Sequence, residues 1–364
     1  MSKADRAGAI LEVDLAAVVA NWQLLRAKHP SGPVAGVVKA DGYGLGARPI
    51  VQALHTAGCR HFFVALLDEA VEIRALIPDA LLAVLGGLIT GTEADYLAHD
   101  IVPVLGSLGE IGDWATMARR TGRTLPAIMH IDTGMSRLGL VPRDLAVLQQ
   151  DHARLAGIEL RYVMTHLVAS EVATDPLNER QRQRFADACA RLPPAPRSFA
   201  NSSGIFLGSG WHSDLARPGA ALYGINPTPN EPNPMHPTVR LRARVLTVRD
   251  VPVGSSVGYN ATWHASGLSR IATAAIGYAD GLHRSLSNRG RAFFDGTPVP
   301  LVGRVSMDLT TFDVTQAPGV VPGAWLEIIG PEQTPDDLAA AAATNGYEVL
   351  TSLGRRFHRI YKSA

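Results

Sequence analysis

Several apolar segments of the sequence are followed directly by side chains that could do acid–base chemistry. Lys39 comes after the apolar run Ala35–Val38 and before a glycine-rich turn at residues 41–46. An amine at the buried end of a strand loses hydration, which lowers its pKa and makes it the kind of nucleophile that Schiff-base chemistry requires. Taken alone, Lys39 is explained more simply as a lysine that reaches solvent from a strand end.

Other polar residues occupy comparable positions further along the chain. Asp132 and Arg137 follow one strand-like run, His166 follows the next, and Asn201 comes after a third. Cys and His residues show no zinc-type spacing, and the chain has no P-loop and no G-x-G-x-x-G after its first strand. We therefore expect neither a metal site nor a nucleotide site.

The elements that must position these residues alternate between strand-like and helix-like patterns. The strand-like runs are Val34–Val38, His61–Ala65, Leu81–Leu85, Ile101–Leu105, Ala127–Ile131, Glu159–Thr165, Arg197–Ala200 and Gly219–Tyr223. Helical patterns between them include Asp68–Leu76, Asp144–Ala153 and Leu177–Leu192. Eight such units predict an N-terminal (β/α)8 TIM-type barrel, whose reactive groups gather at the C-terminal ends of the strands. A doubly wound open sheet would alternate in the same way.

The pattern changes after residues 226–237, which hold five prolines in twelve positions. Such a segment can continue neither a helix nor a central strand. Beyond it one helical pattern, Pro335–Thr344, accompanies β-type segments at Thr238–Val251, Arg270–Ile276, Arg291–Phe294, Pro300–Val305, Thr310–Val314 and Trp325–Ile329, with a hairpin turn at Asp295–Gly296. We predict two domains, a barrel over residues 1–235 and a mainly β domain over residues 236–364.

Composition excludes several classes of protein. Lys plus Arg number 34 against 33 for Asp plus Glu, a balance that does not favour a nucleic-acid partner. The longest apolar run, Ala80–Ile89, is too short to span a bilayer. Two cysteines without motif spacing, together with the absence of an apolar leader in residues 1–10, favour a cytoplasmic protein.

An ordered set of motifs identifies a family. The motifs are V-V-K-A-D-G-Y-G-L-G (37–46), D-T-G-M-S-R-L-G (132–139), T-H-L (165–167), A-N-S (200–202), R-P-G-A-A-L-Y-G (217–224), V-G-Y-N-A-T-W (257–263), G-Y-A-D-G (277–281) and G-R-V-S-M-D (303–308). Together they resemble alanine racemases, pyridoxal-phosphate enzymes made of a (β/α)8 barrel and a mainly β domain. Any one of these motifs is weak evidence, whereas the ordered set is highly specific.

The resemblance implies two acid–base groups. Racemisation removes the α-proton from one face of the substrate and returns it to the other, which favours a base on each side. By the resemblance Lys39 binds pyridoxal phosphate covalently and serves one face, while Tyr259 of the partner subunit serves the other. The active unit is then a homodimer with shared active sites. Free tyrosine has a pKa near 10, so a neighbour such as His166 must assist Tyr259, which without its motif would be an ordinary strand residue.

The resemblance also implies how cofactor and substrate are held. Arg217 would face the pyridine nitrogen, and Arg137 would bind the substrate carboxylate. The main chain at Met307 of the partner subunit would meet the same carboxylate, although without its motif Met307 resembles a core methionine. The cofactor phosphate would be bound by the side chains of Ser202 and Tyr43 and by the amides of Gly219 and Ala220, and His166 would lie beside the cofactor. The corridor through which substrate enters would be lined by Tyr278, Arg284 and Glu171.

Three positions depart from the family pattern. His130 stands where some members have a carbamylated lysine, so Arg137 must be held differently, by His130 itself or by a bound anion. No tyrosine occurs at Gly354–Phe357, where many members place one against the phosphate, and Arg355 is at best a loose substitute. Ser198 replaces a histidine that supports the cofactor-facing arginine, which should weaken the hydrogen bonding around Arg217.

These observations predict an alanine racemase that interconverts L- and D-alanine and, in a bacterial cell, supplies D-alanine for peptidoglycan. An amino-acid racemase of broader specificity, acting on serine or larger side chains, is the nearest alternative. A non-catalytic pyridoxal-phosphate-binding protein is a further one, although single-barrel proteins of that kind lack the β domain and its tyrosine.

Overall fold

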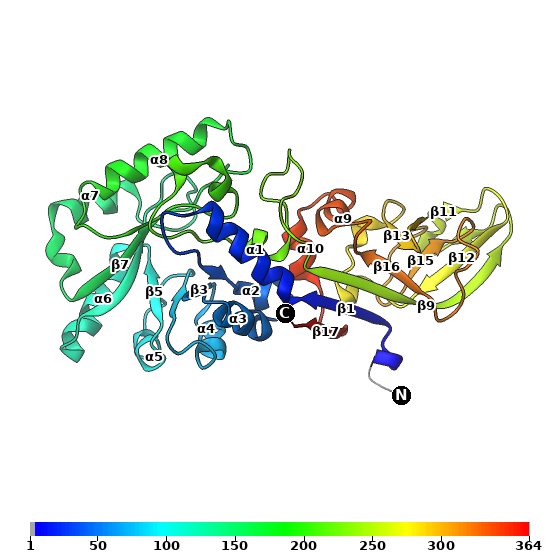
Figure 1. Ribbon diagram of the computed structural model, residues 1–364, viewed down its shortest axis with the longest axis horizontal. Coiled ribbons are helices and arrows are strands. Elements are labelled where there is room, and N and C mark those ends of the chain that lie inside the picture. Colours follow the sequence, from blue (N-terminus) through cyan, green and yellow to red (C-terminus); the bar gives the residue numbers. More distant parts are fainter. Residues whose placement is uncertain (1–3, 364) are drawn as a thin grey trace.

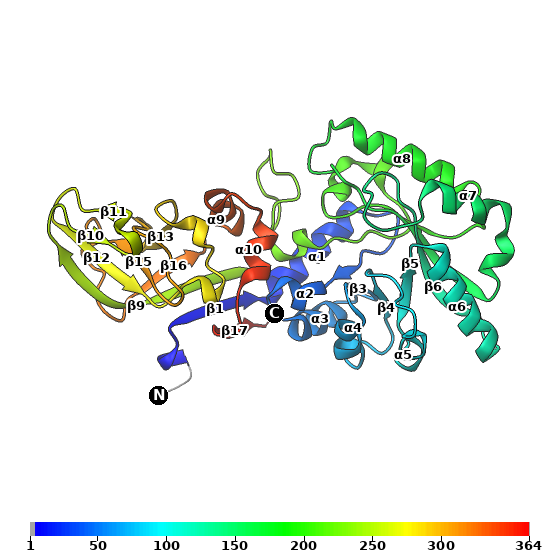
Figure 2. The ribbon, with the colours of Figure 1, turned by 180° about the vertical axis from the view of Figure 1, so that it is seen from behind.

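The computed structural model describes residues 4–363. Two parts lie side by side along the long axis of the molecule, a barrel with its surrounding helices and a second part built mostly of strands (Figures 1 and 2). This confirms the predicted fold class, an N-terminal (β/α)8 barrel followed by a mainly β region.

Seven parallel strands run in chain order around the barrel. They are β2 (Gly36–Val37), β3 (His61–Val64), β4 (Leu81–Val84), β5 (Val102–Leu105), β6 (Leu125–His130), β7 (Ile158–Met164) and β8 (Arg197–Ser198). Parallel bridges join Leu215 to Ser198 and Ala216 to Val34 and so close the ring. The two residues Leu215 and Ala216 therefore take the place of the eighth strand.

The predicted eighth strand, Gly219–Tyr223, is wrong. Residues Ala220–Tyr223 form the 3₁₀ helix η5 instead. Pro218 has no N–H to donate to a ladder, and the chain leaves the ring after Arg217. The apolar character of the segment comes from its burial as a short helix and not from strand pairing.

Helices cover the barrel, and their starts follow the sequence. The helices are α1 (Leu15–Lys28), α2 (Lys39–Tyr43), α3 (Ala47–Thr56), α4 (Leu67–Arg74), α5 (Glu93–Ala98), α6 (Leu108–Thr121), α7 (Pro142–Gln150) and α8 (Pro176–Cys189), with 3₁₀ turns η1 (Ala4–Arg6), η2 (His152–Leu155), η3 (Ser203–Leu207) and η4 (Ser209–Trp211). The side chains of Asp14, Ser107 and Asp175 accept hydrogen bonds from the first turns of α1, α6 and α8.

The second part is centred on one mixed sheet in the order β14-β13-β16-β9-β1-β17, with β12 pairing β9 and β15. Its elements are β1 (Ala9–Asp14), β9 (Val239–Val251), β10 (Ser256–Val257), η6 (Tyr259–Ala261), β11 (Trp263–His264), β12 (Ser269–Ala274), η7 (Tyr278–Asp280), η8 (Arg284–Leu286), β13 (Arg291–Phe294), β14 (Thr297–Pro300), β15 (Thr310–Asp313), β16 (Trp325–Ile329), α9 (Pro335–Ala342), α10 (Gly346–Ser352) and β17 (His358–Lys362).

Two features of this sheet differ from the prediction. Asp295 and Gly296 form the expected hairpin turn, both with positive φ, but the returning strand is Thr297–Pro300 and not Pro300–Val305. The unpredicted strand β1 pairs antiparallel with β9 and parallel with β17. The first strand of the chain thus lies in the sheet of the second part, while the proposed division at residues 235/236 stays a prediction.

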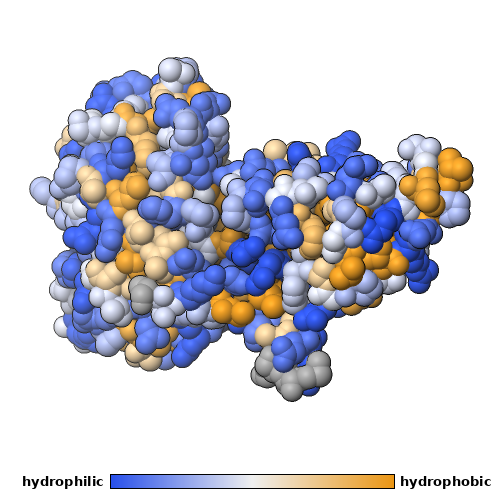
Figure 3. Space-filling view, turned by 45° about the vertical axis from the view of Figure 1, so that its right-hand side comes forward, coloured by the Kyte–Doolittle hydropathy of each residue, from blue (hydrophilic) through white to orange (hydrophobic). Residues whose placement is uncertain are grey.

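Apolar side chains also remain on the surface of the second part, where Figure 3 shows hydrophobic atoms at its outer end. The large apolar residues that the second part exposes include Leu246, Val253, Tyr259, Leu268, Tyr278, Met307 and Leu309. Among the described helices none is long and apolar enough to cross a membrane.

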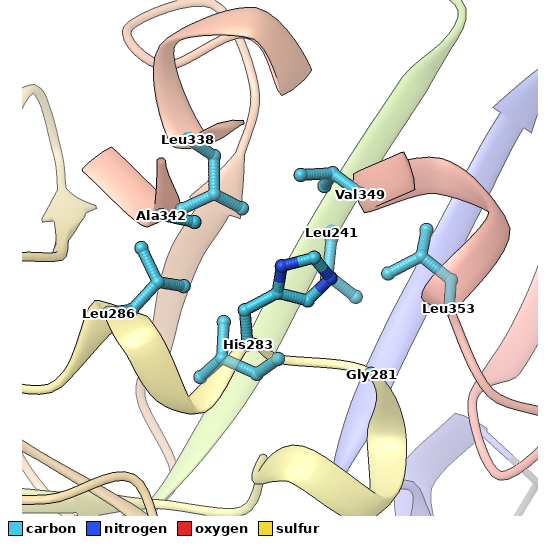
Figure 4. A pocket seen from close by; sticks show the side chains of 9 residues that line it. Leu241, Gly281, His283, Leu286, Leu338, Ala342, Val349 and Leu353 are labelled. Carbon is cyan, nitrogen blue, oxygen red and sulfur yellow. The ribbon is translucent and has the colours of Figure 1, made fainter. Parts of the chain in front are cut away.

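A small apolar recess lies between β9, η8, α9 and α10, with His283 at its centre (Figure 4). Its walls include Leu241, Leu338 and Val349, and the His283 Nε2 lies 2.9 Å from the Ser352 hydroxyl. The free volume is about 10 Å³, room for at most one water molecule. The recess is therefore a packing feature and not a site.

Candidate functional site

A cavity of about 410 Å³ opens at the C-terminal ends of the barrel strands. Its size is typical of cofactor and ligand pockets. The predicted site residues Lys39, Tyr43, Arg137, His166, Glu171, Ser202, Arg217, Gly219 and Ala220 all line it. The structure thus brings together the predicted residues of the barrel, and two residues of α10, Tyr347 and Thr351, complete the wall.

Lys39 is followed by a left-handed turn. Ala40, Asp41 and Tyr43 have φ angles of 55°, 53° and 54°, a conformation that costs about 1–2 kcal/mol for each residue with a β-carbon. Backbone bonds from Gly42 N to Val38 O (2.9 Å) and from Gly44 N to Ala40 O (2.7 Å) hold the turn. A strained turn at this place indicates that the surrounding structure fixes the position of the lysine.

The Lys39 amine lies in an environment that disfavours its charged form. Burial lowers its pKa below the ordinary value, the positive charge of Arg137 lowers it further, and the carboxylate of Glu69 opposes both effects. A larger fraction of the amine is consequently neutral, and able to attack a carbonyl or accept a proton, than in a free lysine.

Arg217 is a buried cation, 5% exposed, and no carboxylate of the described residues pairs with it. Its guanidinium donates to the carbonyl of Thr165 (2.5 Å) and to the hydroxyl of Ser198. Burial lowers its pKa to about 10, so it stays protonated at neutral pH. Ser198 does support Arg217, because its hydroxyl accepts from the guanidinium and donates to Leu215 O (2.8 Å). That this support is weaker than a histidine would give stays a prediction.

Another part of the cavity wall gathers hydroxyl and amide groups. The Ser202 hydroxyl accepts from the amides of Gly219 (3.0 Å) and Ala221 (3.2 Å). The hydroxyl of Tyr43 lies against Gly219, where a β-carbon would come within 2.1 Å of it. Burial raises the pKa of Tyr43 above its ordinary range, so the phenol remains a neutral donor. Hydroxyls and amides gathered at a glycine suit an anion such as a phosphate.

Arg137 extends from a tightly folded loop. The Asp132 carboxylate accepts hydrogen bonds from the amides of Gly134 (2.9 Å), Met135 (2.9 Å) and Ser136 (3.1 Å), which fixes the loop that carries the arginine. Among the described residues, no side chain forms a hydrogen bond or ion pair with the Arg137 guanidinium. The arginine is exposed and free to bind an incoming carboxylate.

Two histidines near these arginines are neutral at physiological pH. Burial, and then the charge of Arg217, lower the pKa of His166 to about 3 and that of His130 to about 4. His130 lines a neighbouring cavity with Arg137, so it contributes an uncharged imidazole at that position. His166 can assist a tyrosine by hydrogen bonding but not as a cation.

Four predicted site residues do not line the cavity. Tyr259, Met307 and Tyr278 are 68%, 54% and 44% exposed, and Arg284 is exposed as well. Tyr259 belongs to η6, between β10 and β11. These two strands lie in the outer half of the second part, away from the barrel (Figures 1 and 2). One copy of the chain therefore does not bring Tyr259 to Lys39. Met307 is a surface residue and not a core methionine.

Sequence reasoning missed Tyr347. Arg355 is exposed and is not part of the cavity wall, whereas Tyr347 reaches it from α10. Burial and then the charge of Glu171 raise the pKa of Tyr347, and Tyr347 in turn contributes to the raised pKa of Tyr43. The start of α10 is marked in the sequence by Asn345, whose side chain caps the helix at the amide of Glu348 (2.9 Å).

Comparison with known proteins gives this site its family. Residues 13–227 match the alanine racemase N-terminal domain, and residues 238–361 match the alanine racemase C-terminal domain. The chain belongs to the alanine racemase family. This confirms the resemblance drawn from the ordered motifs between residues 37 and 308.

Individual alanine racemases match almost end to end. An alanine racemase of Acidiphilium cryptum is 53% identical over 97% of this chain and 98% of its own length. A catabolic alanine racemase of Mesorhizobium japonicum is 47% identical over 98% of this chain and 93% of its own length. The crystal structure of the Bartonella henselae alanine racemase with covalently bound pyridoxal phosphate is 40% identical, covers 98% of this chain and 100% of that one, and superposes with a TM-score of 0.95.

Proposed function

We propose that this alanine racemase family member interconverts L- and D-alanine with pyridoxal phosphate as its cofactor. The observation that carries the proposal is the composition of the barrel cavity. An amine of lowered pKa, a buried arginine and a group of hydroxyl and amide donors all line one space of about 410 Å³. Aldehyde, pyridine nitrogen and phosphate are the three groups that these features would bind.

The residues present fit pyridoxal phosphate. Lys39 would bind its aldehyde, and Arg217 would hydrogen-bond its pyridine nitrogen. The close approach of the Tyr43 hydroxyl to Gly219 leaves no room for a β-carbon there, and small residues of this kind let amides approach an anion. Ser202, Tyr43 and the amides of Gly219 and Ala220 would hold the phosphate, with Tyr347 on the same wall.

The bound cofactor would withdraw electrons from the substrate Cα and make its proton acidic. The chain's own groups then hold and move that proton. We propose that Lys39 is the base on one face and Tyr259 of the partner subunit is the base on the other. His166, neutral in its buried environment, would stand beside the cofactor as a hydrogen-bonding group.

The position of Tyr259 supports a homodimer with shared active sites. Its phenol is exposed in the outer half of the second part, and the apolar residues exposed on the same part include Tyr278 and Met307. Exposed apolar surface of this kind is typical of a surface that another protein covers. We infer that a second copy covers it and brings Tyr259, the main chain at Met307, Tyr278 and Arg284 to the partner's cavity.

Arg217 favours racemisation over transamination. A guanidinium hydrogen-bonds a pyridine nitrogen without transferring its proton, and even a pKa of about 10 leaves it charged at pH 7. By leaving that nitrogen without a full proton, Arg217 would limit how strongly a bound cofactor draws electrons away from the substrate Cα, which would favour return of the proton to that carbon. Arg137 would bind the substrate carboxylate, and Glu171 at the cavity edge, with Tyr278 and Arg284, would line the corridor through which substrate enters.

In a bacterial cell the product D-alanine would serve peptidoglycan synthesis in the cytoplasm. Relatives include a catabolic enzyme of Mesorhizobium japonicum and a biosynthetic one of Pseudomonas aeruginosa, the latter 33% identical with a TM-score of 0.90 over 98% of this chain and 100% of its own. Relatedness thus fits either a biosynthetic or a catabolic role.

The test is incubation of the purified protein with L-alanine and pyridoxal phosphate in deuterated water. D-alanine carrying α-deuterium should appear with the parent and disappear with Lys39→Ala. Deuterium entering with retention of the L-configuration would show that one base works without the other and would contradict the two-base proposal. Equal turnover of serine would favour the broader-specificity alternative, and the absence of both product and exchange with cofactor bound would favour a non-catalytic binding protein.

A further inference from the structure

Glu69, in the first turn of α4, connects two neighbouring βα units of the barrel. Its Oε2 accepts hydrogen bonds from the amides of Ala65 (2.8 Å) and Leu66 (3.1 Å), which precede its own helix. Its Oε1 accepts from the amide of Ala40 at 2.6 Å. The last bond reaches back to the preceding unit, to the residue that follows Lys39.

The same arrangement occurs a second time. Glu110 occupies the equivalent place in the first turn of α6, where its Oε2 accepts from the amide of Gly106 (2.6 Å) before its own helix. Its Oε1 accepts from the amide of Leu88 (2.9 Å) in the preceding unit. Two glutamates in the same helical position therefore connect neighbouring loops at the same end of the barrel. Such a first-turn carboxylate stabilises the helix in both cases.

The two glutamates differ in what they hold. The loop held by Glu110 contains Leu88 and carries none of the proposed cofactor ligands. The loop held by Glu69 begins at Lys39 and enters the left-handed turn at Ala40, whose backbone conformation is unfavourable without an external partner. A carboxylate bonded to the amide of Ala40 supplies that partner, and short charge-assisted hydrogen bonds are among the stronger ones in proteins.

We infer that Glu69 is a positioning residue for Lys39, fixing the turn that aims the amine into the cavity and placing a negative charge beside it. The inference rests on the proposed function only in taking Lys39 as the reactive lysine. Nothing in it requires Glu69 to touch substrate or cofactor, and Glu69 is not part of the cavity wall.

The charges around Lys39 define what the loss of Glu69 should change. Arg137, from the loop after β6, disfavours the protonated amine, whereas Glu69, from α4, favours it. His166, after β7, is also close enough for its own pKa to be lowered by Lys39, and it is neutral. Removing the Glu69 charge should therefore lower the pKa of Lys39 and leave the amine reactive at lower pH.

The experiment compares Glu69→Ala with the matched control Glu110→Ala, both as full-length apoprotein. Hydrogen–deuterium exchange reports the backbone, and the pH dependence of Lys39 acetylation, measured by mass spectrometry, reports the amine. With Glu69→Ala, amides in the segment 39–46 should exchange at least about tenfold faster, and Lys39 should be acetylated at lower pH than in the parent. With Glu110→Ala, faster exchange should be confined to the segment around Leu88.

Glu69→Gln keeps the length of the side chain and one acceptor oxygen, so it provides the test if Glu69→Ala does not fold. It should shift the acetylation profile in the same direction as Glu69→Ala, with a smaller rise in exchange. The inference is overturned if neither Glu69 variant changes both readouts, or if Glu110→Ala shifts the Lys39 profile equally. Both readouts are independent of racemase activity, so a failure here is distinguishable from a failure of the deuterium experiment.

Discussion

Replacing Arg217 with methionine should stabilise the apoprotein. The guanidinium is buried without a carboxylate among the described residues, and burial lowers its pKa from the ordinary arginine range to about 10. Because the folded state binds this proton more weakly than the unfolded chain, folding costs about 3 kcal/mol at every pH well below 10. The cost disappears only as the pH rises from about 10 toward the pKa of an unfolded arginine, so it is present in full at pH 7.

A methionine side chain is about as long as that of arginine. The substitution removes the guanidinium charge of Arg217 and also its two hydrogen bonds, to Thr165 and Ser198. The Thr165 carbonyl loses its partner, at a cost of about 1–2 kcal/mol, whereas the Ser198 hydroxyl still donates to Leu215 O. The net expectation is an Arg217→Met apoprotein more stable by about 1–2 kcal/mol, together with a large loss of pyridoxal-phosphate affinity. Arg217 would then be a residue kept for function at the expense of stability.

The assay is urea unfolding of both apoproteins at pH 7 and equal protein concentration, followed by circular dichroism. The exposed Arg182, paired with Glu179 on α8, provides a control, since Arg182→Met should change stability by less than about 0.5 kcal/mol. An Arg217→Met variant less stable than the parent by 1 kcal/mol or more would refute the reasoning and make Arg217 a structural support of the barrel.

Three other predictions follow from the site. Refolding a mixture of Lys39→Ala and Tyr259→Phe chains should restore about one quarter of the parent racemase activity, because half of the dimers then hold one intact shared site; no recovery would contradict shared sites. Gly219→Ala forces a β-carbon to within 2.1 Å of the Tyr43 hydroxyl and should weaken pyridoxal-phosphate binding, measured by absorbance titration, at least about tenfold; unchanged affinity would argue against a tightly fitted phosphate site. Because unfolded His166 takes up a proton near pH 6.5 and the folded form only near pH 3, the parent loses stability as the pH falls through this range. The melting temperature of His166→Gln should fall less steeply between these pH values, and parallel curves would show that the histidine is not buried neutral.

The alternation of strands and helices in the barrel was predictable because its strands are short, apolar and bounded by polar residues. The predicted runs at His61–Ala65 and Leu81–Leu85 match β3 and β4 within a residue. The residues of the barrel site were predictable in the same way, since Lys39, Arg137 and Arg217 follow or precede buried segments whose ends converge.

Other features depend on contacts that local patterns do not report. Strand β1 is recognisable only through its partners β9 and β17, more than two hundred residues away. Tyr347 reaches the cavity because α10 packs beside the glycine-rich turn after Lys39, a tertiary arrangement that no periodicity reveals. The support of Arg217 by Ser198 likewise depends on the closing bridge of the barrel, which the sequence alone placed at the wrong segment.

The pairing of β1 with β17 has a consequence for synthesis on the ribosome. β1 ends at Asp14, and its parallel neighbour begins at His358. At a rate of synthesis of about 5–20 residues per second, β17 is translated roughly 20 to 70 seconds after β1. During this time the edge of β1 that pairs with β17 has no partner. The barrel can close during that interval, whereas the mixed sheet of the second part is completed only once β17 has been translated. Chains truncated before β17 should therefore expose an unpaired strand and be recognised by the cell's quality-control machinery, although their barrel is already formed.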